Sequence, residues 1–182
     1  YEAVDALDLD DPVLMCEELG DVLMQVAFHT CMEQETGRFT WEQVCDGVCQ
    51  KLIERHPNIF GTQPGYEGIT DWDALKNKEK GRRTLADDLE SVPRAMPALM
   101  RAAKLQKRAA RHGAALQGAD AAALADAAEN LQTAQPASAQ AEQAVGELLF
   151  AAANLARQAG VDPEQALQKA NEAFCTAAGP VA

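Results

Sequence analysis

Residues 12–35 read PVLMCEELGDVLMQVAFHTCMEQE. Pro12 suits the first turn of a helix, and Gly37, two residues beyond the stretch, suits a helix stop. Between them, apolar residues recur at intervals of three and four, the spacing of one helical face. They are Leu14, Leu19, Val22, Leu23, Val26 and Ala27. The stretch therefore predicts one long helix.

Helical patterns continue through the rest of the chain. Thr40 opens a helix with a Thr-x-x-Gln capping box, and this helix ends at His56 because Pro57 follows. Residues 56–70, rich in Gly and Pro, predict a loop. Further helices are expected at residues 1–8, 71–81, 93–112, 119–133, 142–159 and 163–174. Pro97 is expected to bend or delay the first turn of the helix at 93–112. Because no stretch alternates like a half-buried strand, the predicted fold class is all-α.

The composition limits the class of protein. Of 182 residues, 47% are hydrophobic and 24% charged, as in a soluble globular protein. A net charge of −12 argues against nucleic acid or an anionic membrane as a partner of the whole chain. No apolar run approaches the roughly 18 residues that span a bilayer. Five cysteines without a CxxC motif predict reduced thiols in a cytoplasmic protein.

An internal repeat divides the chain. ELGDVLM at residues 18–24 matches AVGELLF at residues 144–150. Two copies of one helical hairpin explain this match, and chance similarity between Leu-rich helices is the alternative. The predicted parts are a first module at 1–81, a connecting basic helix at 82–118 and a second module at 119–182. Because residues 1–8 already read as the end of a helix, we expect the natural chain to continue upstream.

Three acidic residues interrupt the apolar pattern of the first long helix: Glu17, Glu18 and Asp21. Residues three and four apart share one side of a helix, so these carboxylates are expected to repel one another. A hard divalent cation with oxygen ligands would relieve the repulsion. The alternative is a solvated acidic turn. Gly20 lies within this group, and a glycine inside a helix predicts close packing by a neighbour.

Two further pairs are spaced one helical turn apart: Lys51 with Arg55, and Trp72 with Lys76. Carboxylates that bind Mg²⁺, together with separate cations, are the parts needed to bind a metal–polyphosphate complex. Trp72 either stacks on a base or caps a small core. Neither a P-loop nor a GxGxxG motif is present.

Eleven of the sixteen Lys and Arg residues fall between residues 76 and 111. This basic band either solvates two surface helices or faces an anionic ligand. A nucleic-acid-binding module is a rival interpretation, which the net charge of −12 disfavours.

Three segments, in order, resemble the MazG nucleoside triphosphate pyrophosphohydrolases: CEELGDVLMQVAFH, KLIERHPNIFG and DWDALKNKEK. VPRAMPALMRAAKLQKRAAR resembles the inter-domain helix of that family, and GELLFAAANLARQAGVDPEQALQKANEAF resembles a second MazG domain. The resemblance covers nearly the whole chain except residues 113–141.

The family pattern is EExxE, a spacer, then ExxD. Glu18 and Asp21 match ExxD, and Glu2 matches the last Glu of EExxE, whose first two Glu would precede Tyr1. The resemblance implies Mg²⁺ binding by the acidic positions, namely Glu2, Glu17, Glu18 and Asp21. It implies substrate binding by Lys51, Arg55, Trp72 and Lys76. Catalysis is implied for Glu18, Asp21, Lys51 and Arg55.

The second module departs from this pattern. Ala144 stands where ExxD requires Glu, and Glu147 replaces Asp. Gln143 replaces the neighbouring acid, and alanines replace the Lys/Arg pair. Asp126 and Glu129 fit EExxE only roughly. We therefore expect the metal site in the first module alone.

What the resemblance implies is an all-α enzyme that uses Mg²⁺ to cleave NTPs and dNTPs between the α and β phosphates and cleans nucleotide pools. The alternative is a catalytically compromised scaffold that binds nucleotide without turnover. A homodimer is also implied. Independently, helix 13–35 is apolar around much of its circumference and needs cover. Either a second copy supplies that cover in a four-helix bundle, or the second module folds back and the protein stays monomeric.

Overall fold

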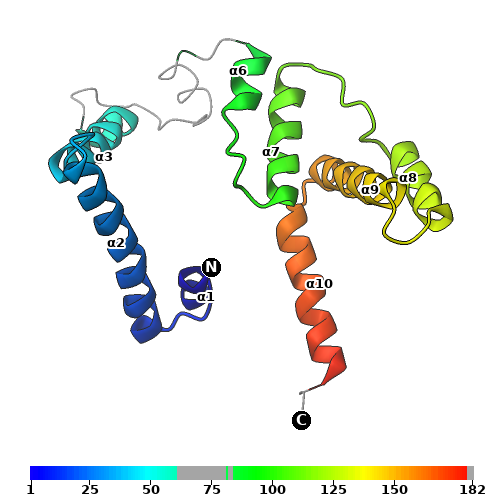
Figure 1. Ribbon diagram of the computed structural model, residues 1–182, viewed down its shortest axis with the longest axis horizontal. Coiled ribbons are helices and arrows are strands. Elements are labelled where there is room, and N and C mark those ends of the chain that lie inside the picture. Colours follow the sequence, from blue (N-terminus) through cyan, green and yellow to red (C-terminus); the bar gives the residue numbers. More distant parts are fainter. Residues whose placement is uncertain (61–80, 82–83, 180–182) are drawn as a thin grey trace. The chain divides into compact units, whose positions relative to one another are not determined.

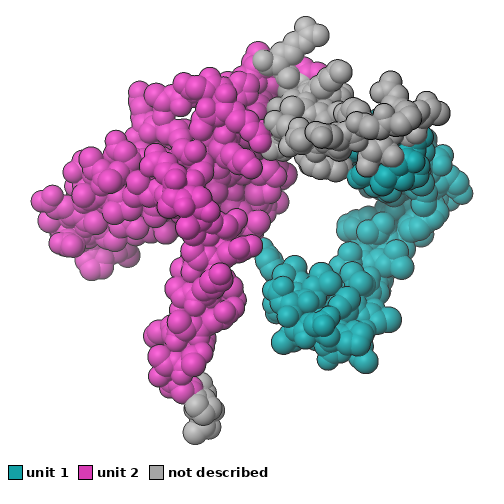
Figure 2. All heavy atoms as spheres, turned by 180° about the vertical axis from the view of Figure 1, so that it is seen from behind, with its two compact units in different colours: residues 1–75 teal, residues 76–182 magenta. Residues whose placement is uncertain are grey.

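The computed structural model of the chain describes residues 1–60, 81 and 84–179, and the regular structure in that part is entirely helical (Figure 1). The all-α prediction is therefore confirmed. The chain divides into two compact units, residues 1–75 and residues 76–182 (Figure 2). The three-part division at residues 81 and 118 stays a prediction. None of the described helices is both long and apolar enough to cross a bilayer.

The first unit contains α1 (Glu2–Asp8), α2 (Pro12–Glu35), α3 (Trp41–Arg55) and the single turn α4 (Pro57–Phe60). Helix α2 contacts both α1 and α3. Its predicted bounds are confirmed. The Asp11 side chain caps it by accepting bonds from the N–H groups of Val13 and Leu14, at 2.9 and 3.2 Å. Gly37 follows its end at a φ of +69°, a conformation that glycine adopts without strain.

The predicted capping box of α3 is confirmed. Thr40 accepts from the N–H of Gln43, and the Gln43 side chain accepts from the N–H of Thr40 at 2.8 Å. The predicted loop after His56 is wrong for its first residues. The N–H groups of Ile59 and Phe60 donate to the His56 carbonyl, and this closes α4. A proline at the first position of a helix is pre-set for this turn.

The first unit buries little of its apolar surface. Among its described residues only Ala6 and Thr30 are buried. On α2, Val22 is 51% exposed and Leu23 is 60% exposed. A helix with such a surface is stable only when another element covers it. The need for cover that the sequence predicts is therefore visible in the structure of this unit.

The second unit contains α6 (Leu85–Glu90), α7 (Ala98–Arg111), α8 (Ala121–Thr133), α9 (Ala139–Gln158) and α10 (Pro163–Ala178). Helix α9 is central and contacts α7, α8 and α10. The buried apolar residues of this unit are mostly alanines, which let helices approach closely: Ala109, Ala119, Ala127, Ala144, Ala151 and Ala153.

The helix bounds in this unit differ from prediction by up to five residues, at α7, α8, α9 and α10, and one helix is additional. Helix α7 begins at Ala98 and not at residue 93, because Pro97 takes the N-cap position with a ψ of 135°. The expected delay at Pro97 is thus confirmed. Helix α6 was not predicted. Its N-cap Thr84 forms a capping box with Asp87, which stands where Glu or Gln is usual.

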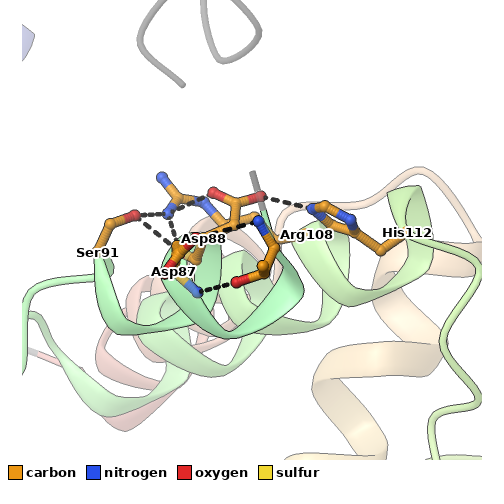
Figure 3. A network of polar contacts seen from close by, with 6 residues as sticks. Asp87, Asp88, Ser91, Arg108 and His112 are labelled. Atoms are coloured by element: carbon orange, nitrogen blue, oxygen red, sulfur yellow. Dashed lines mark hydrogen bonds and ion pairs between the residues drawn. The ribbon is translucent and has the colours of Figure 1, made fainter. Parts of the chain in front are cut away.

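A buried polar network joins α6 to α7 (Figure 3). Asp88 is 2% exposed, and its Oδ1 lies 3.0 Å from Nη1 of Arg108, which is 6% exposed. Nη1 of Arg108 also donates to the Asp88 carbonyl and to Oγ of Ser91. Nε2 of His112 lies 3.3 Å from the other carboxylate oxygen. This network holds a six-residue helix that would be marginal alone.

Candidate active site

A pocket of about 260 Å³ opens between α1 and α2. Three of the four predicted metal ligands line it: Glu2 from α1, and Glu18 and Asp21 from α2. We call it the acidic pocket. Its other lining residues are Tyr1, Ala3, Val22, Met24 and Gln25. No sequence pattern assigns Tyr1, Met24 or Gln25 to the site, and the sequence predicts Val22 in a bundle interface.

The turn between α1 and α2 brings together the two helices that line the acidic pocket. Asp10 has a φ of +51°, in the left-handed region that Asp tolerates better than most residues. The chain reverses there, and α1 packs back on α2 with Ala6 fully buried. Glu2 therefore comes to the same pocket as Glu18 and Asp21. A Cβ built at Gly20 meets no atom within 4 Å, so the predicted close packing at that glycine is wrong for this chain.

Glu18 is the carboxylate most affected by its surroundings. It is half-buried, whereas Glu2, Glu17 and Asp21 are exposed. Loss of hydration raises the pKa of Glu18 above its ordinary value. The negative charges of Glu2, Asp21 and Glu17 raise it further. A cation in the pocket would oppose the effect of these charges.

The chemistry of the donor set fits a hard divalent cation, because carboxylate oxygens are the ligands that Mg²⁺ prefers. Glu17 does not line the pocket but contributes to its negative potential at Glu18. Within the described residues, no three His, Cys, Asp or Glu side chains are grouped closely enough to hold one ion. The carboxylates thus share a pocket without converging on a point, and the Mg²⁺ site stays a prediction.

Two of the predicted cationic residues, Lys51 and Arg55, are among the described residues. Lys51 and Arg55 sit one turn apart on α3, as expected, with Lys51 exposed and Arg55 half-buried. Neither lines the acidic pocket. Trp72 and Lys76, together with the helix predicted at 71–81, lie outside the described residues apart from Gly81.

A second pocket, of about 770 Å³, lies between α8 and α9, the hairpin of the internal repeat. Asp126 and Glu147 both line it. Oε1 of Glu147 accepts a hydrogen bond from Nε2 of Gln143 at 2.7 Å. Gln143, which replaces an acidic residue in the second hairpin, thus donates a hydrogen bond to the remaining carboxylate, that of Glu147. The sequence analysis did not predict this pocket, although the repeat carried the signal.

A family model described as the MazG nucleotide pyrophosphohydrolase domain matches residues 1–60, which include the acidic pocket. The chain is also similar to the nucleoside triphosphate pyrophosphohydrolase of Escherichia coli K12, with 38% identity over 183 residues, covering 96% of this chain and 70% of the relative.

The nucleoside triphosphate pyrophosphohydrolase/pyrophosphatase MazG of Thermotoga maritima is 38% identical over 176 residues, covering 96% of this chain and 68% of that protein. The Mycobacterium tuberculosis nucleoside triphosphate pyrophosphohydrolase is 35% identical over 117 residues, 62% of this chain and 35% of its own length. These similarities confirm the resemblance seen in the sequence. Because two of them extend over nearly the whole chain, it belongs to the MazG family of nucleotide pyrophosphohydrolases.

Proposed function

We propose that the chain hydrolyses nucleoside triphosphates with Mg²⁺ between the α and β phosphates. Water adds across this anhydride bond, giving a nucleoside monophosphate and pyrophosphate. The observation that carries the proposal is the acidic pocket, in which burial and the charges of carboxylates from two helices raise the pKa of Glu18. Membership of a family of nucleotide pyrophosphohydrolases supports the same reaction.

The acidic residues have two tasks in this proposal. Glu2, Glu18 and Asp21, with Glu17 beside them, hold Mg²⁺ and orient the attacking water. When bound, the ion supplies Lewis-acid chemistry at the phosphate oxygens. Besides burial, the negative charges that raise the pKa of Glu18 in the metal-free chain favour binding of such an ion in the pocket.

The cationic residues act on the other side of the substrate. Lys51, Arg55 and Lys76 bind phosphate oxygens and stabilise the negative charge that develops in the transition state. Trp72 stacks on the nucleobase. A site that recognises mainly metal and phosphates accepts both NTPs and dNTPs, which suits the cleaning of nucleotide pools. Five free and exposed cysteines support a reducing compartment, the cytoplasm.

A symmetric homodimer completes the proposal. Leu14, Val22, Leu23 and Val26 become buried when α2 packs in a four-helix bundle with a second copy. Support comes from the exposure of the last three in the first unit, which for Val26 is 42%, and Leu14 is half-buried. Because Lys51 and Arg55 do not line the acidic pocket of their own chain, the partner chain brings its phosphate-binding groups towards that pocket.

Pyrophosphate release is the direct test of the activity. The eight common ribo- and deoxyribonucleoside triphosphates are supplied with Mg²⁺, and matched reactions contain a chelator. We expect release that requires the metal. If no nucleotide yields pyrophosphate while nucleotide still binds, the chain is the catalytically compromised scaffold instead. For assembly, a stable mass near 19.5 kDa by light scattering at micromolar concentration would exclude the dimer.

A further inference from the structure

Helix α3 carries two cysteines one helical turn apart. Cys45 and Cys49 are both free and exposed, and they lie within the continuous helix Trp41–Arg55. The other three cysteines have no cysteine within a turn of them in the sequence. Residues four apart on a helix share a face, with Cβ atoms about 5–6 Å apart. Cys45 and Cys49 therefore share a face of α3, whereas Cys16, Cys31 and Cys175 have no second cysteine one turn away on their own helix.

The pair is open to solvent and has space beside it. Val44 and Gly47 of the same helix are half-buried, whereas both cysteines lie on its exposed side. Cys49 lines a hollow of about 500 Å³ with Asp46, Gly47, Gln50 and Ile53. An ion bound at the thiols can thus keep part of its hydration.

The spacing of the two thiols favours a metal over a disulfide. A disulfide requires Cβ atoms about 3.5–4.5 Å apart, which is shorter than this helical spacing allows. A metal ion lengthens the bridge, because it adds two metal–sulfur bonds between the thiols, each about 2.3 Å when the metal is Zn²⁺. Two thiolates on successive turns can therefore hold one ion while the helix stays intact.

We propose that Cys45 and Cys49 form a two-thiolate site for a soft, thiophilic metal ion such as Cd²⁺ or Cu⁺. Thiolates select soft ions, whereas Mg²⁺ prefers the oxygen ligands of the acidic pocket. Both thiol protons pass to solvent as the two sulfur–metal bonds form. No third His, Cys, Asp or Glu joins the pair within the described part of the chain, so solvent fills the other coordination positions.

Titration with Cd²⁺ tests the site. The native chain is kept reduced with a phosphine, and excess Mg²⁺ occupies carboxylate sites. We expect ultraviolet thiolate-to-metal charge-transfer absorption that saturates at one Cd²⁺ per chain, with release of two protons. Replacing either thiol, by Cys45→Ser or Cys49→Ser, removes the chelate and weakens binding by roughly a hundredfold.

A spacing variant is the matched control. Gly47→Cys combined with Cys49→Ser keeps five thiols but puts two of them two residues apart, on nearly opposite sides of α3. A Cβ at Gly47 meets no atom within 4 Å, so this variant should fold. We expect it to bind as weakly as Cys49→Ser, and we expect Cys16→Ser to bind like the native chain. Native-like Cd²⁺ affinity in the spacing variant overturns the proposal, and so does absence of the absorption in the native chain.

Discussion

Glu2 on α1 and Glu18 on α2 line one pocket, and the charge of Glu2 helps to raise the pKa of Glu18. The two residues are separated by the reversal of the chain at Asp10. This relationship gives α1 a part in the proposed site, since residues 1–3 and residues of α2 line the pocket together. The properties of Glu18 thus depend on the packing of a seven-residue helix.

Asp21→Asn is expected to lower Mg²⁺-dependent pyrophosphate release by orders of magnitude, because one charged ligand of the proposed ion is lost. The matched change in the repeated hairpin is Glu147→Gln, which should alter the rate little. Steady-state rates at several Mg²⁺ concentrations make the comparison. Equal losses from both changes would show that the active hairpin is wrongly assigned.

Glu18→Gln should raise the melting temperature at neutral pH when Mg²⁺ is absent. The pKa of Glu18 is higher in the folded state, so its ionisation opposes folding above that pKa and has no effect below the unfolded-state value. The gain should therefore disappear as the pH falls below the ordinary carboxyl range. Thermal unfolding across pH measures it.

Added Mg²⁺ should reverse the order of the two melting temperatures, so that the native chain melts above Glu18→Gln. The ion stabilises the native chain by binding its folded state, while the Glu18→Gln variant gains less. If Glu18→Gln melts at a lower temperature than the native chain at neutral pH without metal, ionised Glu18 does not oppose folding and the explanation is wrong.

Arg108→Ala should destabilise the second unit by about 3–5 kcal/mol, because it leaves the buried Asp88 carboxylate without its main partner. The control is Arg38→Ala. Arg38 is paired with Glu33 on the surface, where loss of an ion pair costs about 1 kcal/mol or less. Urea unfolding curves give both values. If both variants lose similarly little unfolding free energy, the polar network between α6 and α7 does not stabilise the second unit.

Two glycines of the second unit should respond in opposite directions. Gly146 lies inside α9, and a Cβ there meets no atom within 4 Å, so Gly146→Ala should stabilise by about 0.5–1 kcal/mol. Gly160 has a φ of +69°, so Gly160→Ala should destabilise by about 1–2 kcal/mol. Thermal unfolding separates the two. Destabilisation by Gly146→Ala would reveal a contact that the single chain does not show.

Local signals predicted the fold well where a helix has its own caps and periodicity. Pro12, Gly37 and the Thr40 capping box fix the ends of α2 and α3. Helix α6 has a capping box at Thr84, but its six residues are too few to show a hydrophobic period, and it is held by a contact between Asp88 and Arg108, which are twenty residues apart in sequence. Periodicity cannot report such a contact.

The same distinction holds for the candidate site. The proximity of Glu18 and Asp21 follows from helix geometry. Glu2 entered the prediction only through resemblance, because no pattern of spacing states that α1 folds back on α2. The position of Lys51 relative to the acidic pocket depends on how α3 leaves α2, which local propensity does not determine.

Ala144 occupies in α9 the place that Glu18 occupies in α2, and it is only 2% exposed. A glutamate restored there would place a charge inside a seam fitted to methyl groups, where burial is costly. The single change Ala144→Glu is therefore expected to destabilise the packing of α9. If the two hairpins descend from one ancestor, the close packing that α9 has acquired now opposes the return of an acidic side chain at position 144.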